Sequence, residues 1–97
     1  MTFEQFQLSD EVMKALHALN YKQPTEVQQK IIPQIIKERD CIVQAKTGSG
    51  KTASFAIPLI EQIEWIENKP QVLVLTPTRE LAVQVAEEFT AIGRYKR

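Results

Sequence analysis

A chain of 97 residues is too short for more than one domain, and its 43% apolar residues suffice for a modest core. Twelve basic and twelve acidic residues cancel, so any contact with a polyanion must depend on local placement of donors rather than on net charge. The single cysteine, Cys41, excludes an intrachain disulfide and fits a cytoplasmic protein, and no apolar run approaches the roughly 18 residues of a membrane span.

Two amphipathic helices are predicted in the first part of the chain. The first spans 9–19, with Ser9 as a suitable N-cap and Asn20 as the closing residue, because asparagine tolerates the left-handed conformation. The second begins at Thr25, and Pro33 should bend or split it. The apolar residues at helical spacing are Val12, Ala15, Leu16 and Leu19 in the first helix and Val27, Ile31 and Ile35 in the second.

Strands and helices alternate in the rest of the chain. The apolar runs 41–43 and 72–75 are predicted as buried strands. A loop at 45–50 and a third helix, ended by Asn68-Lys69-Pro70, lie between them, and a final helix follows Pro77-Thr78. The apolar positions of these two helices are Phe55, Leu59, Ile63 and Ile66, then Leu81, Val85, Phe89 and Ile92. The alternation implies an α/β fold with parallel strands joined by right-handed crossovers.

Two strands are too few for such a sheet, since sheets average about five or six strands. The chain is therefore expected to be the N-terminal portion of a doubly wound domain. Its sheet would have unpaired edges, and the chain is expected to self-associate in order to bury them.

The segment AKTGSGKT, residues 45–52, nearly matches the phosphate-binding pattern G-x-x-x-x-G-K-[ST], with alanine in place of the first glycine. It follows a predicted strand and opens a predicted helix, where backbone N–H groups can hold phosphate oxygens. A glycine-rich turn without a ligand is the alternative. The expected nucleotide-binding residues are Ala45, Lys46, Thr47, Gly48, Ser49, Gly50, Lys51 and Thr52; Lys51 and Thr52 are the expected catalytic residues, and the Thr52 hydroxyl is the expected Mg²⁺ ligand.

Two further motifs flank this loop, NYKQPTEVQ at 20–28 and PTREL at 77–81. With A-x-T-G-S-G-K-T between them, the chain resembles the DEAD-box ATP-dependent RNA helicases over essentially its whole length, through that family's Q motif, motif I and motif Ia. Alanine is the family's usual first residue of motif I. The last residues, from Ile92 on, are similar to bacterial members of the DbpA type.

The resemblance implies a P-loop NTPase of RecA-like fold, an α/β parallel sheet with flanking helices. Residues 1–97 would be its N-terminal portion, and 1–29 the Q-motif region. ATP and Mg²⁺ are the implied cofactors, and RNA is the implied partner.

The Q motif is expected to recognise the base. Gln28 carries an amide donor and an acceptor, the pairing that the N6 and N7 edge of adenine needs. The resemblance implies that Gln28 selects ATP over GTP and that Thr25 bonds to the phosphate loop; it also adds Gln23 to the nucleotide contacts and places Phe3 on the adenine ring. Thr25-x-x-Gln28 is equally a capping box at a helix start. Phe3 taken alone would be a core or chain-end residue, and Phe6 is assigned to packing.

PTREL follows the carboxyl end of a predicted strand, where open α/β sheets place their ligand sites. Its side chains and the N–H groups of the new helix can donate to phosphate oxygens. The resemblance implies that Pro77, Thr78, Arg79 and Glu80 bind the RNA backbone without reading its sequence. The alternative is an ordinary helix start, with Thr78 as the N-cap and Glu80 in the first turn.

Hydrolysis of ATP also needs an acidic residue that holds Mg²⁺ and an arginine that meets the developing charge. The family supplies these from its D-E-A-D motif and from a second domain, and no strand followed by Asp-Glu is found in this sequence. The parent protein is therefore expected to be an ATP-dependent RNA helicase, and this chain alone to be inactive in hydrolysis. The alternatives are a non-catalytic nucleotide-binding or assembly fragment and a DNA helicase of the same superfamily.

Overall fold

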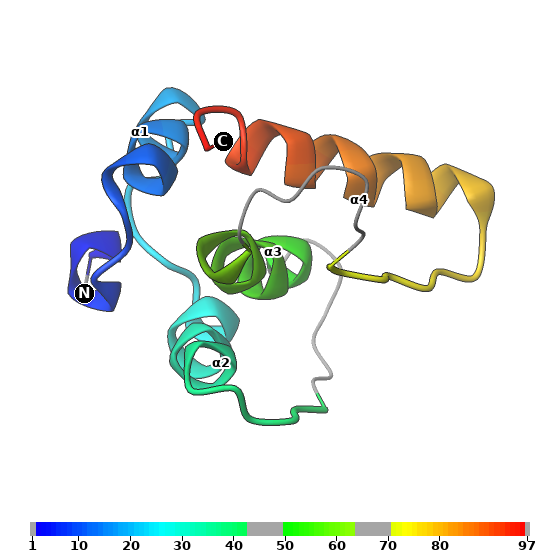
Figure 1. Cartoon of the computed structure of the whole chain (residues 1–97), viewed down its shortest axis with the longest axis horizontal. Coiled ribbons are helices and arrows are strands. Elements are labelled where there is room, and N and C mark those ends of the chain that lie inside the picture. Colours follow the sequence, from blue (N-terminus) through cyan, green and yellow to red (C-terminus); the bar gives the residue numbers. More distant parts are fainter. Residues whose placement is uncertain (1, 43–49, 64–70, 97) are drawn as a thin grey trace.

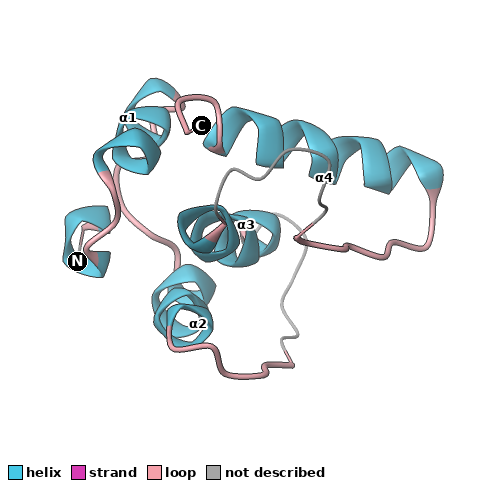
Figure 2. Cartoon of the chain, in the orientation of Figure 1, coloured by secondary structure: helices cyan, strands magenta, loops and turns pink. Residues whose placement is uncertain are grey.

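The computed structural model describes residues 2–42, 50–63 and 71–96, and its regular elements are helical (Figure 2). A short 3₁₀ helix, η1 (Phe3–Phe6), is followed by α1 (Asp10–Ala18), α2 (Glu26–Ile36), α3 (Lys51–Gln62) and α4 (Arg79–Ile92). Helix α3 packs against both α2 and α4, and α1 lies beside the C-terminal end of α4 (Figure 1). The helices predicted from the sequence are thus confirmed in type and order. None of those described is long and apolar enough to cross a lipid bilayer.

Helix α1 begins and ends where its sequence predicts. The Ser9 hydroxyl accepts a hydrogen bond from an N–H of the first turn, which satisfies one of the free donors there. Asn20 takes the left-handed conformation with φ 64°. Its N–H donates to the His17 carbonyl at 3.1 Å, and the N–H of Tyr21 donates to the Leu16 carbonyl at 2.9 Å. This pair of bonds is a Schellman motif, and it fixes the position of Tyr21 just after the end of α1.

The core is built around α3, whose small residues Ala53 and Ala56 let its neighbours approach closely. The predicted apolar stripe Phe55, Leu59 and Ile63 is only half-buried, because α3 lies between two helices and buries a different face. Fully burying an aliphatic side chain contributes roughly 1.5–3 kcal/mol, so the largest buried residues dominate the packing. The core cluster comprises Phe3, Phe6, Val12, Leu16, Ile32, Ala53, Ala56, Ile57, Ile60 and Ile92, which confirms Phe6 as a packing residue.

The predicted strands are not found in the described parts of 41–43 and 72–75, and Val43 lies outside the described residues. Instead of being buried, Ile42, Leu73 and Leu75 are 99%, 84% and 85% exposed, and Cys41 is exposed as a free thiol. A strand requires a neighbour that accepts its backbone hydrogen bonds. The described residues offer none, so the parallel sheet is not part of the described structure.

The predicted end of the third helix is also wrong. Helix α3 ends at Gln62, and Ile63 is extended, with φ −72° and ψ 148°. The Gln62 amide donates to the carbonyls of Ile35 and Ile36, each at 3.0 Å, which ties this end of α3 to the end of α2. Ile66 and the predicted stop at 68–70 lie outside the described residues.

Candidate functional site

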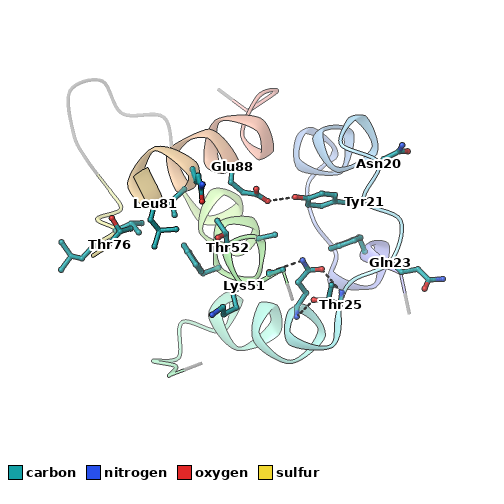
Figure 3. A pocket seen from close by; sticks show the side chains of 18 of the residues that line it. Asn20, Tyr21, Gln23, Thr25, Lys51, Thr52, Thr76, Leu81 and Glu88 are labelled. Atoms are coloured by element: carbon teal, nitrogen blue, oxygen red, sulfur yellow. Dashed lines mark hydrogen bonds between the residues drawn. The ribbon is translucent and has the colours of Figure 1, made fainter. Parts of the chain in front are cut away.

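A cleft of about 870 Å³ brings the three sequence motifs together. Its lining comes from 20–28, from 50–55, from 74–77 and from the inner face of α4. Figure 3 shows that side chains from these separate parts of the chain surround one space. The volume lies within the roughly 300–1,000 Å³ of small-molecule sites.

Gly50 lies at the junction between the predicted phosphate loop and α3. It is the N-cap of the helix and has φ 84°, a conformation that residues with side chains rarely adopt. A Cβ atom built on Gly50 would also lie 2.5 Å from Nε2 of Gln28, which is a clash. The left-handed φ therefore favours glycine here, and a larger residue would also have to displace the Gln28 amide.

Lys51 and Thr52 are the first two residues of α3, and both line the cleft. Lys51 is exposed and Thr52 is half-buried. N–H groups in the first turn of a helix lack intrahelical acceptors and carry partial positive charge. This end of the cleft therefore offers an ammonium group, a hydroxyl and a helix N-terminus to an anion. The remaining predicted loop residues, Ala45, Lys46, Thr47, Gly48 and Ser49, lie outside the described residues.

Thr25 and Gln28 form the capping box that their spacing allows. The Gln28 N–H donates to the Thr25 hydroxyl at 3.3 Å, and the Thr25 N–H donates to Oε1 of Gln28 at 2.9 Å. The structural alternative for this pair is therefore confirmed. Gln28 does more, because its Nε2 donates to the carbonyl of Gly50 at 3.3 Å. Within the described residues, Gln28 rather than Thr25 makes the hydrogen bond from the Q motif to the start of α3.

Two aromatic residues meet at the Q-motif end of the cleft. Phe3 is 2% exposed and packs edge-on against Phe6, with ring centroids 6.0 Å apart. Its ring is also stacked with that of Tyr21, at 6.2 Å and 27° between planes. Both Phe3 and Tyr21 line the cleft, and Tyr21 is half-buried. The same wall includes Gln23, which is exposed.

Sequence reasoning missed the pair formed by Tyr21 and Glu88. The Tyr21 hydroxyl donates to Oε1 of Glu88 at 2.5 Å, joining the segment after α1 to the middle of α4 (Figure 3). Burial and the Glu88 carboxylate raise the pKa of Tyr21, so the hydroxyl stays protonated as a donor. A signal was present, because Glu88 stands between Val85 and Ile92 on the apolar stripe of its helix. A carboxylate on a stripe that faces the core needs a partner.

Some residues of the PTREL segment line the cleft and others do not. Pro77 lines the cleft, whereas Thr78, Arg79 and Glu80 are exposed and are not part of its lining. The Thr78 hydroxyl accepts from the Leu81 N–H at 3.1 Å and caps α4, with Glu80 in the first turn. The helix-start alternative is therefore confirmed, and the side chain of Arg79 is left in solvent.

Charge is distributed unevenly along the described part of the cleft wall. Lys22 and Lys51 contribute cations, and Glu88 is the one carboxylate among the described lining residues. That carboxylate is occupied by Tyr21. The described wall therefore favours an anionic ligand at the α3 end.

The chain matches the DEAD/DEAH box helicase family over residues 25–97. It is 57% identical over 95 residues to the ATP-dependent RNA helicase DbpA of Bacillus subtilis, covering 98% of this chain and 20% of that protein. It is 47% identical over 96 residues to the DEAD-box ATP-dependent RNA helicase CshA of Geobacillus kaustophilus, covering 99% of this chain and 21% of that protein. The chain thus spans about a fifth of the length of these relatives.

The chain is also similar to part of two solved protein structures. A DEAD box protein from the hyperthermophile Methanococcus jannaschii matches with a TM-score of 0.86 at 47% identity, over 96% of this chain and 26% of that one. Dbp5 of S. cerevisiae, bound to RNA and ADP BeF3, matches with a TM-score of 0.92 at 29% identity, over 98% of this chain and 25% of that one. The fold of this chain is therefore similar to that of part of these two proteins.

Proposed function

The chain belongs to the DEAD/DEAH box helicase family, and on this premise we propose that it is the N-terminal portion of an ATP-dependent RNA helicase. It binds ATP through the Q motif and the phosphate loop, and the RNA backbone through PTREL. Residues 1–97 form the first part of a RecA-like domain with a parallel sheet, and 1–29 form the Q-motif region. The relatives named above are RNA helicases, which does not favour a DNA helicase.

The observation that carries this proposal is the contact between Gln28 and Gly50. The residue proposed to recognise the base lies within hydrogen-bond distance, 3.3 Å, of the N-cap residue of the proposed phosphate-binding helix. A nucleotide triphosphate must be held at its base and at its phosphates, and one cleft presents residues suited to both. A cleft lined by only one of these residues would not support the proposal.

Gln28 keeps the capacity to pair with adenine while making its bonds to the protein. Its Oε1 accepts one hydrogen bond, from Thr25, and its Nε2 donates one, to Gly50. An amide oxygen has two lone pairs and an amide nitrogen has two hydrogens, so, counting bonds to the described residues alone, one acceptor position and one donor remain on this buried side chain. These complement the N6 donor and N7 acceptor of adenine, and guanine presents an acceptor in place of that donor.

The triphosphate lies at the α3 end of the cleft. Lys51 and the first N–H groups of α3 bind phosphate oxygens, and Gly50 lets the backbone approach them. Thr52 is half-buried at the cleft wall, and its hydroxyl would hold the Mg²⁺ that accompanies ATP and neutralises phosphate charge. The chain alone is proposed to bind ATP without hydrolysing it.

RNA binding is proposed for the start of α4. Arg79 is exposed at the helix N-terminus, and Thr78, Pro77 and Glu80 shape the turn that leads into it. An exposed guanidinium and a helix N-terminus bind phosphate without regard to base sequence. The proposed RNA contact therefore lies beside the cleft rather than inside it.

Self-association is also proposed for the chain on its own. Ile42, Leu73 and Leu75 are each largely exposed, and large apolar side chains in water favour association. A second copy of the chain can cover such side chains, as the sequence prediction of unpaired strands suggested.

Titration of the purified chain with ATP and GTP, in the presence and absence of Mg²⁺, tests the proposed nucleotide site. We expect ATP to bind more tightly than GTP, and Lys51→Ala to weaken both. Gln28→Ala should reduce the preference for ATP about tenfold, since a bidentate base contact contributes roughly 1–3 kcal/mol of discrimination. Lys30→Ala is the matched control, because Lys30 is exposed on α2 and pairs with Glu26 away from the cleft. Equal binding of ATP and GTP by the unaltered chain would contradict the role of Gln28.

A further inference from the structure

We propose that the C-terminal end of α4 carries a second binding site for single-stranded RNA, in which a hollow between the ends of α3 and α4 receives one unstacked base and neighbouring cations hold phosphates. This site is separate from the nucleotide cleft, because the two share no lining residue within the described part of the chain. The inference goes beyond the proposed function, and it rests on that function only for the identity of the polyanion as RNA.

The hollow has a volume of about 500 Å³. This lies within the roughly 300–1,000 Å³ of small-molecule sites, so the space is sufficient for one base. Its described lining combines apolar side chains from the ends of both helices, Ile60, Ile63 and Phe89, with the cations Arg94 and Lys96. An apolar space bordered by cations suits a ligand that has a flat uncharged part and an anionic part.

Phe89 gives the hollow an aromatic surface. Its ring is half-buried and packs against that of Phe55, which lines the nucleotide cleft instead, with centroids 5.9 Å apart and 47° between planes. Phe89 is therefore supported by Phe55, while part of its surface meets the hollow. Bases of every kind stack on aromatic side chains, and single strands are commonly bound in this way without sequence preference.

Three cations gather at this end of α4. Lys14 of α1 and Arg94 both lie over the ring of Tyr95, with Nζ of Lys14 at 4.5 Å and Cζ of Arg94 at 5.6 Å from its centroid. The third cation, Lys96, donates to the carbonyl of Glu61 at 2.7 Å, and its ammonium group has two further hydrogens. Tyr95 thus holds two like charges near each other, beside a hollow that one of them lines.

Within the described residues, none of these three cations forms an ion pair with a carboxylate. Glu61 meets Lys96 through its carbonyl, and its carboxylate accepts instead from the N–H of Ser9 at 2.8 Å. Arg94 and Lys96 also complement the negative C-terminal end of α4. That role accounts neither for Lys14, which lies in the middle of α1, nor for the hollow. An anionic ligand would supply the countercharge.

RNA fits this combination better than an acidic peptide does. Every nucleotide carries a phosphate beside a flat base, which matches cations that border an apolar hollow, whereas a peptide would need an acidic and an aromatic residue at one particular spacing. The site lies at the end of α4 opposite to the one that begins with Arg79 (Figure 1). The 14 residues of α4 separate the two ends by about 21 Å, roughly six steps of a stacked strand. A strand of about ten nucleotides is therefore long enough to meet both ends.

The test measures, by fluorescence anisotropy, how the purified chain binds oligouridine of about ten nucleotides and the same sugar–phosphate strand without bases. Arg94→Gln and Lys14→Gln should each weaken oligouridine several-fold at low salt. Each should also lower the slope of log affinity against log salt by about 0.7, the value for one phosphate contact of a single strand. Phe89→Leu should weaken oligouridine about fivefold and leave the strand without bases unchanged, because stacking needs a base.

Lys37→Gln is the matched control. Lys37 is exposed at the end of α2 and lines neither cavity, so the same loss of charge there should change neither the affinity nor the salt slope. Thermal unfolding of each variant shows whether it is folded at the temperature of the titration. Phe89 packs against the core cluster, whereas Arg94 is exposed, so Arg94→Gln keeps the test decisive if Phe89→Leu unfolds.

Arg79→Gln separates the inference from the proposed function. If it weakens oligouridine and the Arg94 and Lys14 variants do not, the inference fails and the proposed contact at PTREL stands. The reverse result would support the second site and contradict the contact at PTREL. If the unaltered chain binds neither strand, both RNA contacts fail, and the ATP titration still decides the nucleotide site.

Three further results would overturn the inference. Losses for Lys37→Gln equal to those for Arg94→Gln would show that only net charge matters. A polyglutamate peptide that displaces oligouridine from the unaltered chain, but not from Arg94→Gln, would assign the site to an acidic protein partner. A lower mass of Phe89→Leu in light scattering, with unchanged affinity for oligouridine, would assign the hollow to a second copy of the chain.

Discussion

The side-chain amide of Gln28 donates to the carbonyl oxygen of Gly50 at 3.3 Å, so the first turn of α2 is bonded to the N-cap residue of α3. The bond is possible because Gly50 has no side chain in the space that Gln28 occupies. Gln28 in turn is held by the capping box with Thr25. A capping interaction, a glycine and a contact between two helices thus form one unit at the cleft.

Replacement of Gly50 by alanine should disrupt this unit. An L-residue in the left-handed conformation costs roughly 1–2 kcal/mol, and the new Cβ would displace Gln28 in addition. We expect the free energy of unfolding to fall by about 2 kcal/mol, measured by denaturant titration, and ATP to bind more weakly.

Gly93→Ala provides the comparison for that experiment. Gly93 has φ −89°, which alanine accepts readily, and its Cβ would lie 3.2 Å from the Phe89 carbonyl. The expected loss of stability is therefore smaller than at Gly50. Equal losses at the two positions would show that the left-handed conformation and the approach of Gln28 are not the cause.

The starts of α1, α2 and α4 and the end of α1 could be predicted because their causes are local. Ser9, Thr25 and Thr78 each accept a hydrogen bond from an N–H three residues later, and Asn20 adopts the conformation that a helix end requires. All of these interactions lie within a few residues of sequence. A single sequence therefore contains the information that sets them.

The strands could not be predicted in the same way. Leu73 and Leu75 have the composition of a buried strand, yet they are exposed. A strand is stabilised by its neighbours rather than by its own composition, and residues remote in sequence must supply them. For the same reason, the sequence did not show which face of α3 would be buried between two helices.

The structure places residues from separate motifs in one cleft, and their roles in binding stay predictions. Gln28 and Gly50 were identified separately by motif spacing, but their mutual bond depends on how α2 packs against α3. The Tyr21–Glu88 bond connects residues that no motif joins. Only the placement of a carboxylate on the apolar stripe of α4 pointed to it, and that placement does not identify the partner.

The ionisation of Tyr21 gives a test that does not involve a ligand. Burial and the Glu88 carboxylate raise its pKa above the ordinary value of about 10. Because the folded-state pKa is the higher one, the stabilisation is fully present below about pH 10 and is lost as pH rises through the folded-state pKa. Ultraviolet titration of phenolate, with Tyr21→Phe subtracted to remove the other tyrosine, should show the high pKa.

Glu88→Ala should bring the Tyr21 titration to lower pH, since it removes the acceptor and the repelling charge. The same substitution should flatten the loss of stability that the unaltered chain shows in alkali. A Tyr21 titration that stays in place after Glu88→Ala would mean that burial alone raises the pKa.

The exposed apolar residues give a prediction about assembly. Light scattering should show a mass above that of the 11.1 kDa monomer at high protein concentration. Leu73→Lys together with Leu75→Lys should shift the chain towards monomer, because a charge at each position opposes burial of that surface. Leu19→Lys, at a partly exposed position on a different surface, should leave the mass unchanged. A folded monomer at every concentration would contradict the proposed self-association.

Hydrolysis of ATP requires groups that the described lining of the cleft does not supply. Phosphoryl transfer needs a carboxylate that holds Mg²⁺ and an arginine that stabilises the developing charge. The described lining of the cleft contains no arginine, and its one carboxylate, Glu88, is bonded to Tyr21. We therefore expect no phosphate release from the purified chain with ATP, Mg²⁺ and RNA. A chimera in which these residues replace the matching segment of B. subtilis DbpA, 57% identical over 95 residues, should release phosphate when RNA is added.

In that chimera, Lys51→Ala should lower kcat/KM about 100-fold or more, because Lys51 is the cation proposed to contact the transferring phosphate. Lys30→Ala carries the same loss of charge on the exposed side of α2 and should leave the rate unchanged. Phosphate release by the isolated chain that disappears with Lys51→Ala would show that the catalytic groups are already present in it. Full activity of the Lys51→Ala chimera would show that Lys51 takes no part in the reaction. It would also contradict the proposal that the triphosphate binds at the α3 end of the cleft.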